Sequence, residues 1–234
     1  RDSARLQRFV AQHGRVYLKA AGGSLGNHIM ELTPSTSGRW RLRYNYGHDR
    51  TRVAYFNTWS GVWDMVARLS RGRLFLMQQA IPLARADGRP FDLRLLVQKR
   101  SDGEWQFTGG AARVAGPGQI TTHVPRGGRR MAMMTALEEA FGEDAPTLAD
   151  QVARLTEQAA AALERALQRQ FVELSLDVGV DYKGHPWIFE LNAKPLHFDE
   201  PEIQRRRVAN LIGYVAGKVA AMAPSTMATS VKER

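Results

Sequence analysis

Two carboxylates and one amide lie in adjacent strand-like segments near the C-terminal end of the sequence. Apolar and polar side chains alternate through residues 171–180, which places Asp177 on the polar face of a predicted strand. The same alternation in residues 186–192 places Glu190 and Asn192 together on one side. If a four-residue turn joins the two strands, Asp177 lies opposite Glu190.

Two opposed carboxylates repel each other unless a cation neutralises them. Oxygen atoms of Asp, Glu and Asn are ligands that Mg²⁺ accepts together with water and phosphate oxygens. The sequence therefore predicts a magnesium site at Asp177, Glu190 and Asn192. The alternative is a polar strand face on which the two carboxylates simply contact water.

A lysine and a glycine-rich segment follow a strand-like run in the first part of the sequence. Lys19 comes directly after the apolar residues 16–18, and the glycine-rich segment covers residues 22–26. Backbone N–H groups of glycines can approach phosphate closely because no Cβ obstructs them. The pattern G-x-x-x-x-G-K-[ST] is absent from the sequence, which disfavours a P-loop. A solvated strand end is the alternative for Lys19.

The elements that must position these residues follow an α+β pattern, because apolar residues recur at helical spacing in some segments and alternate in others. Strands are expected over residues 16–18, 28–33, 39–45, 51–57, 74–79, 91–99, 105–114, 120–124, 171–180 and 186–192. Helices are expected over residues 3–12 and 59–69, twice in the stretch before residue 171, and around residues 208–219. A polar connection after residue 80 divides a small lobe, residues 1–80, from a large lobe, residues 81–224, and residues 225–234 are expected to fray.

The metal motif and the lysine segment together resemble the ATP-grasp superfamily. The step of thirteen residues from Asp177 to Glu190, followed by Asn192, is similar to the C-terminal metal motif of these enzymes. Lys19 with the glycine-rich segment looks like the loop that closes over the β- and γ-phosphates. Residues 77–81 look like the hinge whose backbone contacts adenine.

Further segments narrow the resemblance to the YheC/YheD endospore coat-associated group. These are residues 78–83, 88–94 and 111–118. The resemblance covers the chain from about Val16 to Pro195. It implies an ATP-grasp fold, in which two α+β lobes with antiparallel sheets enclose ATP and Mg²⁺.

The resemblance also implies a reaction and the residues that serve it. A substrate carboxylate attacks the γ-phosphate to give an acylphosphate, and an amine or similar nucleophile then displaces phosphate. The implied ATP-binding residues are Lys19, Gly22, Gly23, Ser24, Gly26, Gln78, Gln79, Ala80 and Ile81, with the glutamines contributing their backbone. Arg94 is implied to clamp the phosphates and Arg113 to steady the acylphosphate, and Asp92 is expected to orient Arg94. Structural ion pairs are the alternative for both arginines.

Composition limits the partners and the location. The 234 residues include no Cys and carry a formal net charge of +10, which excludes disulfides and thiolate sites and favours an anionic partner. Interleaved strand aromatics and scattered arginines argue against nucleic acid, and the apolar stretches are too short and interrupted to span a membrane. No secretory signal is visible, so we expect a cytoplasmic protein with small-molecule or peptide substrates. The sequence leaves a homo-oligomer open, and the resemblance implies association with spores.

Several departures from the family pattern favour a second hypothesis. Leu196 stands where relatives carry Gly, and His123 stands where they carry Asn. The usual ribose-binding carboxylate has no certain counterpart, because Arg85 lies near its position and Asp87 is only a neighbour. The rival hypothesis is a non-catalytic ATP-binding protein of the spore coat that kept the fold and lost turnover.

Overall fold

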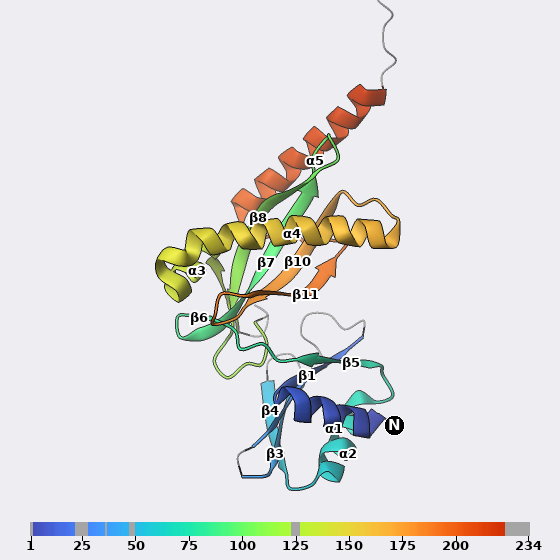
Figure 1. The fold of residues 1–234 in the computed structure, drawn as a ribbon, viewed down its shortest axis with the longest axis vertical. Coiled ribbons are helices and arrows are strands. Elements are labelled where there is room, and N and C mark those ends of the chain that lie inside the picture. Colours follow the sequence, from blue (N-terminus) through green and yellow to red (C-terminus); the bar gives the residue numbers. More distant parts are fainter. Residues whose placement is uncertain (1, 22–27, 36, 47–49, 123–126, 223–234) are drawn as a thin grey trace, which may run out of the picture. The chain divides into compact units, whose positions relative to one another are not determined.

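The computed structural model describes residues 2–21, 28–35, 37–46, 50–122 and 127–222 as an α+β protein with two antiparallel sheets (Figure 1). The elements in chain order are α1 (Asp2–His13), β1 (Val16–Ala20), β2 (Ile29–Pro34), β3 (Trp40–Tyr46), β4 (Arg50–Phe56), α2 (Trp59–Ser70), β5 (Phe75–Gln79), β6 (Arg85–Ala86), β7 (Arg89–Lys99), β8 (Trp105–Val114), β9 (Arg129–Ala132), α3 (Met133–Phe141), η2 (Gly142–Asp144), α4 (Ala145–Leu167), β10 (Glu173–Val180), β11 (Pro186–Asn192) and α5 (Pro201–Met222). The predicted fold class is confirmed.

The first sheet has the strand order β4-β3-β2-β1-β5 and one apolar face. Val16 and Leu18 of β1 are buried on that face with Leu32 and Leu42 of the neighbouring strands. Helices α1 and α2 cover the same face (Figure 1). Because side chains alternate along a strand, Lys19 lies on the opposite face of the sheet, away from this core.

The second sheet has the order β11-β10-β7-β8-β9, and β6 pairs with β7. Its central strands β7 and β10 are buried along almost their whole length. Buried positions on these strands include Asp92 and Asp177, which are 5% and 8% exposed. A buried carboxylate is costly without a partner, so the interior of this sheet must supply positive charge.

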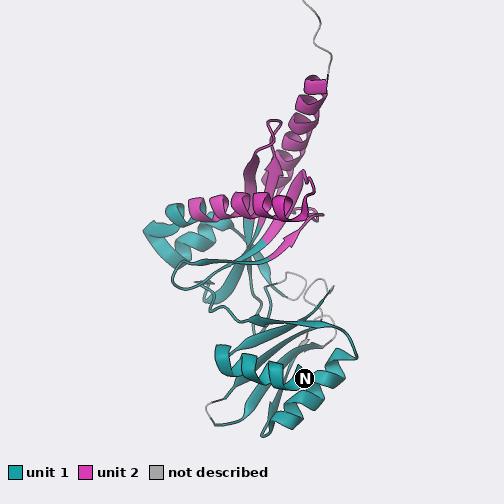
Figure 2. Cartoon of the chain, turned by 45° about the vertical axis from the view of Figure 1, so that its right-hand side comes forward, with its two compact units in different colours: residues 1–94, 111–149, 177–189 teal, residues 95–110, 150–176, 190–234 magenta. Residues whose placement is uncertain are grey.

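Two compact units divide the chain (Figure 2). Unit 1 contains residues 1–94, 111–149 and 177–189, and unit 2 contains residues 95–110, 150–176 and 190–234. The first sheet is built from residues 16–79 and the second from residues 85–192. The predicted cut after residue 80 falls between the two sheets and stays a prediction as a domain boundary.

Most predicted elements agree with the structure to within a few residues, but the two-residue strand β6 was not predicted, and α5 begins at Pro201 rather than near residue 208. Two further differences concern residues 120–132. Residues 120–122 are not in a strand, and the rest of the predicted strand 120–124 lies outside the described residues. Strand β9 was not predicted, because its four residues show no alternation of apolar and polar side chains. It pairs with β8 from Ala111–Ala132 to Val114–Arg129. The predicted hairpin at Asp102 and Gly103 is confirmed, with Gly103 at a φ of 95°.

No helix of the part of the chain that the structure describes has both the length and the apolar character needed to cross a membrane.

Helix α4 is tied to the sheet within unit 2 through Glu164. Its carboxylate lies 2.8 Å from Lys99 Nζ and accepts hydrogen bonds from Trp105 Nε1 at 3.3 Å and from the Phe171 N–H at 3.0 Å. Burial raises the pKa of Glu164, but the Lys99 ammonium and the N–H donors outweigh burial, and the net pKa is below the usual value. The ionised carboxylate therefore stabilises the folded state.

We predict that Glu164→Gln lowers the free energy of unfolding by about 1.5 kcal/mol at pH 7, because charge-assisted hydrogen bonds are lost. The wild-type advantage is complete above the unfolded-state pKa of about 4.3 and is lost as pH falls through the lower folded pKa. Urea denaturation at pH 7 and at pH 3 measures both values. The exposed Glu104→Gln is the control, and a pH-independent difference for Glu164→Gln would contradict the assignment.

Candidate functional site

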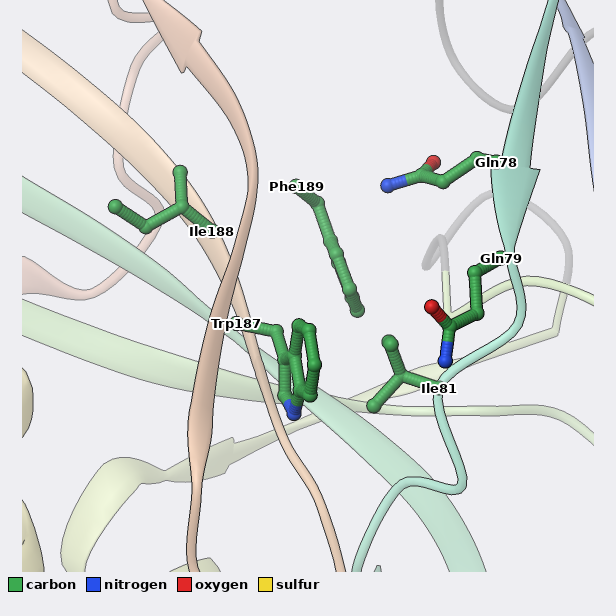
Figure 3. Close-up of a pocket in the computed structure, with 6 residues that line it drawn as sticks. All are labelled: Gln78, Gln79, Ile81, Trp187, Ile188 and Phe189. Atoms are coloured by element: carbon green, nitrogen blue, oxygen red, sulfur yellow. The ribbon is translucent and has the colours of Figure 1, made fainter. Parts of the chain in front are cut away.

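A pocket in unit 1 brings residues of β5 and its following segment against β11 (Figure 3). It has a volume of about 190 Å³ and is lined by Gln78, Gln79, Ile81, Trp187, Ile188 and Phe189. The side chains of Trp187 and Phe189 point toward Ile81 and the glutamines (Figure 3). Two aromatic rings and an aliphatic side chain in the wall of this pocket suit a flat, apolar ligand group.

Gly179 explains why the Phe189 ring lies where it does. A Cβ atom added to Gly179 would lie 2.3 Å from Phe189 Cζ and 2.6 Å from Leu83 Cδ2. Because Gly179 has no side chain, the Phe189 ring and Leu83 occupy the space beside β10 at this position. Glycine serves close approach here and not backbone conformation, since its φ is not among the positive values.

The hairpin between β10 and β11 is tighter than predicted. The Asp181 N–H donates to His185 O at 3.0 Å, and the Gly184 N–H donates to Asp181 O at 2.9 Å, with Gly184 at a φ of 80°. Residue 181 therefore pairs with 185, and the predicted four-residue turn is wrong. An uninterrupted ladder from this pair places Phe189 opposite Asp177, which agrees with the Phe189 ring lying over Gly179.

Lys19 lies beside the same pocket. Its Nζ atom is 5.5 Å from the centroid of the Phe189 ring, within the range of a cation–π interaction. In the sheet, Lys19 is paired with Ile29 on one side and with Leu76 on the other, so β1 fixes the position of its backbone. An ammonium group at the edge of an aromatic pocket is placed to meet an anionic ligand group.

Four charged residues of unit 1 form a connected network. Arg113 makes two hydrogen bonds to Asp92, at 2.9 Å from Nε and 2.7 Å from Nη2. Its Nη2 also lies 3.0 Å from Asp177 Oδ2, and Arg94 Nη1 lies 2.8 Å from Asp177 Oδ1. Asp92 thus orients Arg113, and Arg94 is held by Asp177, so the expectation that Asp92 orients Arg94 stays a prediction.

The network favours the ionised forms of Asp177 and Arg113. Burial alone raises the pKa of Asp177, but the guanidinium groups of Arg113 and Arg94 outweigh burial and hold the pKa below its usual range. Burial lowers the pKa of Arg113, and the carboxylates of Asp92 and Asp177 more than reverse that effect. Asp177 and Gly179 are two residues apart on one strand face, about 7 Å, so this network lies on the pocket side of β10.

The predicted site residues are only partly brought together. The structure places Lys19, Gln78, Gln79 and Ile81 at the pocket, and Ala80 is buried between them at 8% exposed. Glu190 is exposed and Asn192 half-buried in unit 2, whereas Asp177 belongs to unit 1. Gly22, Gly23, Ser24, Gly26 and His123 lie outside the described residues. The ligand roles of all these residues stay predictions.

The described residues contain no cluster of three or more His, Asp or Glu side chains that is placed to hold a metal ion. The predicted magnesium site has only two carboxylates, which together with an amide oxygen are hard donors that leave positions for water and phosphate. The donor types therefore suit Mg²⁺, but both oxygens of Asp177 already contact arginines, and the tighter turn places Phe189 rather than Glu190 opposite Asp177.

Trp187, Ile188 and Phe189 are pocket residues that the sequence did not single out. Strand alternation placed Trp187 and Phe189 on the core side of β11, and apolar side chains carry no signal that separates a core from an apolar pocket. Gly179 was the available clue, since a glycine inside a strand often marks close approach of another group.

Comparison with known proteins decides the family. A family model described as YheC/D-like ATP-grasp matches residues 1–216. The chain belongs to this family. The predicted resemblance is confirmed, and the match covers both sheets and the pocket described above.

Two relatives from Bacillus subtilis (strain 168) have the names endospore coat-associated protein YheD and endospore coat-associated protein YheC. YheD is 29% identical over 187 residues, which cover 77% of this chain and 39% of YheD. YheC is 23% identical over 187 residues, which cover 80% of this chain and 50% of YheC. The chain therefore spans half or less of the length of these relatives.

Among solved structures, D-alanyl-alanine synthetase A from Vibrio cholerae has the same fold. It matches with a TM-score of 0.51 and 13% sequence identity, over 93% of this chain and 53% of the synthetase chain. At this level of identity the likeness concerns the fold alone.

We predict that Asp92→Asn lowers the free energy of unfolding by about 3 kcal/mol, because it removes one partner from a buried ion pair. The matched control is Asp102→Asn, whose pair with Arg100 is about half exposed at 45% and 55% and should change stability by less than about 0.5 kcal/mol. Chemical denaturation at pH 7 measures both variants. Equal effects would show that the buried pair between Asp92 and Arg113 contributes nothing special.

Proposed function

We propose that the chain is the ATP-binding part of a Mg-ATP-dependent ligase that joins a carboxylate to an amine or a similar nucleophile through an acylphosphate. The observation that carries this proposal is the pocket of Trp187, Phe189 and Ile81 with Lys19 at its edge. An aromatic pocket beside a cation matches the two halves of a nucleotide, a flat base and a charged phosphate chain. Membership of the ATP-grasp family supports the same assignment.

In this proposal the adenine ring lies between the aromatic side chains and Ile81. The segment from Gln78 to Ile81 contributes backbone groups to the ring edge, as a hinge. Lys19 then meets the phosphates, together with backbone N–H groups of the predicted glycine loop of Gly22, Gly23, Ser24 and Gly26. Arg94 of β7 is held by its ion pair with Asp177, so the orientation of its guanidinium group is set before a ligand binds.

Family membership is what supports Asp177, Glu190 and Asn192 as the residues that would hold Mg²⁺, because the pairing at the turn no longer places Glu190 opposite Asp177. When bound, the ion neutralises phosphate charge and orients the γ-phosphate. The two arginines on Asp177 show what its carboxylate does otherwise, because they balance its charge in the protein alone. Competition between arginine and cation for Asp177 would leave guanidinium N–H groups available to phosphate oxygens.

The chemistry takes place between bound molecules. A substrate carboxylate oxygen bonds to the γ-phosphorus as the bond to the β-phosphate oxygen breaks, which releases ADP. The nucleophile then bonds to the acyl carbon, loses a proton and displaces inorganic phosphate. In this scheme Arg113 neutralises the developing charge on the acylphosphate, and the bidentate pair with Asp92 fixes its plane.

The names of the two Bacillus subtilis relatives favour a second candidate, a non-catalytic ATP-binding protein associated with the spore coat. This candidate shares the pocket and the family and differs only in turnover. ADP release from Mg-ATP in the presence of mixed amino acids and short peptides separates the two. Saturable binding of ATP with no release of ADP under any condition would overturn the ligase proposal and favour the non-catalytic protein.

We predict that Lys19→Met weakens binding of a non-hydrolysable ATP analogue about tenfold and leaves adenosine binding unchanged, because the lysine meets phosphate rather than base. Isothermal titration calorimetry measures both ligands. The control Lys183→Met removes an exposed lysine of the β10–β11 turn and should affect neither. An equal loss for adenosine would place Lys19 at the base instead.

A further inference from the structure

We infer that Asp181 is a positioning residue that holds the Trp187 indole as a fixed wall of the pocket and thereby sets the affinity for the base of the nucleotide. The inference rests on the proposed function for the identity of the ligand, and on geometry alone for the position of the indole. Trp187 lines the pocket directly, whereas Asp181 acts through it.

The two carboxylate oxygens of Asp181 have separate partners. Oδ1 accepts hydrogen bonds from the backbone N–H groups of Lys183 at 2.9 Å and His185 at 3.0 Å, which closes the turn. Oδ2 accepts from Trp187 Nε1 at 3.0 Å. One oxygen therefore stabilises the hairpin and the other fixes the rotation of the indole ring.

A second contact limits the indole. The His185 ring meets Trp187 edge-on, with centroids 5.0 Å apart and planes at 76°. An indole held at its Nε1 atom and by an aromatic neighbour has little freedom to change rotamer. A wall that is fixed before the ligand binds loses less conformational entropy when the ligand stacks on it.

The Asp181 turn is also joined to the opposite wall of the pocket. The Tyr182 N–H donates to Pro82 O at 3.1 Å, the Ala84 N–H donates to Val180 O at 2.8 Å, and Leu83 bridges Asp181. This short segment directly follows Ile81, which lines the pocket from the other side. Asp181 therefore connects the two walls of the pocket. Its backbone pairs with the segment that follows Ile81, and its side chain holds Trp187.

The carboxylate form is the one that the surroundings favour. Burial raises the pKa of Asp181, but hydrogen bonds from Trp187, His185 and Lys183 outweigh burial and hold the pKa below its usual value. At neutral pH both oxygens are therefore acceptors, as the three N–H donors require.

Asp181→Asn tests the inference because it separates the two oxygens. The amide oxygen can still accept from the turn N–H groups, while the amide nitrogen cannot accept from Trp187 Nε1. Trp187→Phe keeps an aromatic wall and removes the donor. The two single variants and the double variant form a cycle in which the interaction between the residues is measured directly.

The first readout needs no ligand. The chain has five tryptophans, each of which gives one indole N–H signal in the NMR spectrum of ¹⁵N-labelled protein. The signal that disappears in Trp187→Phe is that of Trp187. We expect Asp181→Asn to shift this signal and to speed its exchange with solvent. An unchanged signal would overturn the inference, because the indole would then be held by something else.

The second readout is binding of a non-hydrolysable ATP analogue with Mg²⁺, with inorganic tripolyphosphate as a probe that has no base. We expect Asp181→Asn to weaken analogue binding about tenfold, to leave tripolyphosphate binding unchanged, and to have no further effect in the Trp187→Phe background. Equal losses in both backgrounds, or an equal loss for tripolyphosphate, would assign Asp181 to the turn alone and overturn the inference. Wild-type protein that binds no analogue would instead overturn the proposed function, and the indole signal would still decide the role of Asp181.

Discussion

Buried charge on the central strands constrains much of this structure. Asp92 and Asp177 occupy interior positions of β7 and β10, and ionised carboxylates there require cations within hydrogen-bonding distance. Arg113 supplies one from β8, and Arg94 supplies the other from β7 itself. The network pairs two guanidinium groups with two carboxylates, so the formal charges within it balance. A ligand that draws on one member must change the partners of the others.

The same sheet combines this polar network with an apolar pocket a few residues away. Gly179, two positions after Asp177, has no side chain and leaves room for Phe189. Polar and apolar chemistry therefore follow one another along one face of β10. A nucleotide has the same order of chemical groups, because its base is flat and its phosphates are charged. This correspondence, together with the family match over residues 1–216, is the physical basis of the ATP assignment.

Sequence reasoning succeeded where local pattern and tertiary environment agree. Helices α1 and α2 pack on the apolar face of the first sheet, and its strands were placed to within two residues. Strand β9 was missed because it has only four residues and begins with two exposed arginines, so it shows no alternation of apolar and polar residues. The turn at Asp181 was misjudged by one residue, because the carboxylate of Asp181 binds the N–H groups of Lys183 and His185 and tightens it. Such a side-chain contact cannot be read from alternation, and a change of one residue alters which side chains face each other.

The close packing at Gly179 limits how the pocket can change during evolution. Any substitution at this position adds at least a methyl group where Phe189 Cζ and Leu83 Cδ2 already lie within 2.3 Å and 2.6 Å of the added atom. A larger residue at position 179 therefore requires the ends of the Phe189 and Leu83 side chains to move away or to be replaced by smaller ones. Shortening Phe189 needs no such compensation and widens the pocket. A change at Phe189 is thus the simplest first step toward a different ligand preference.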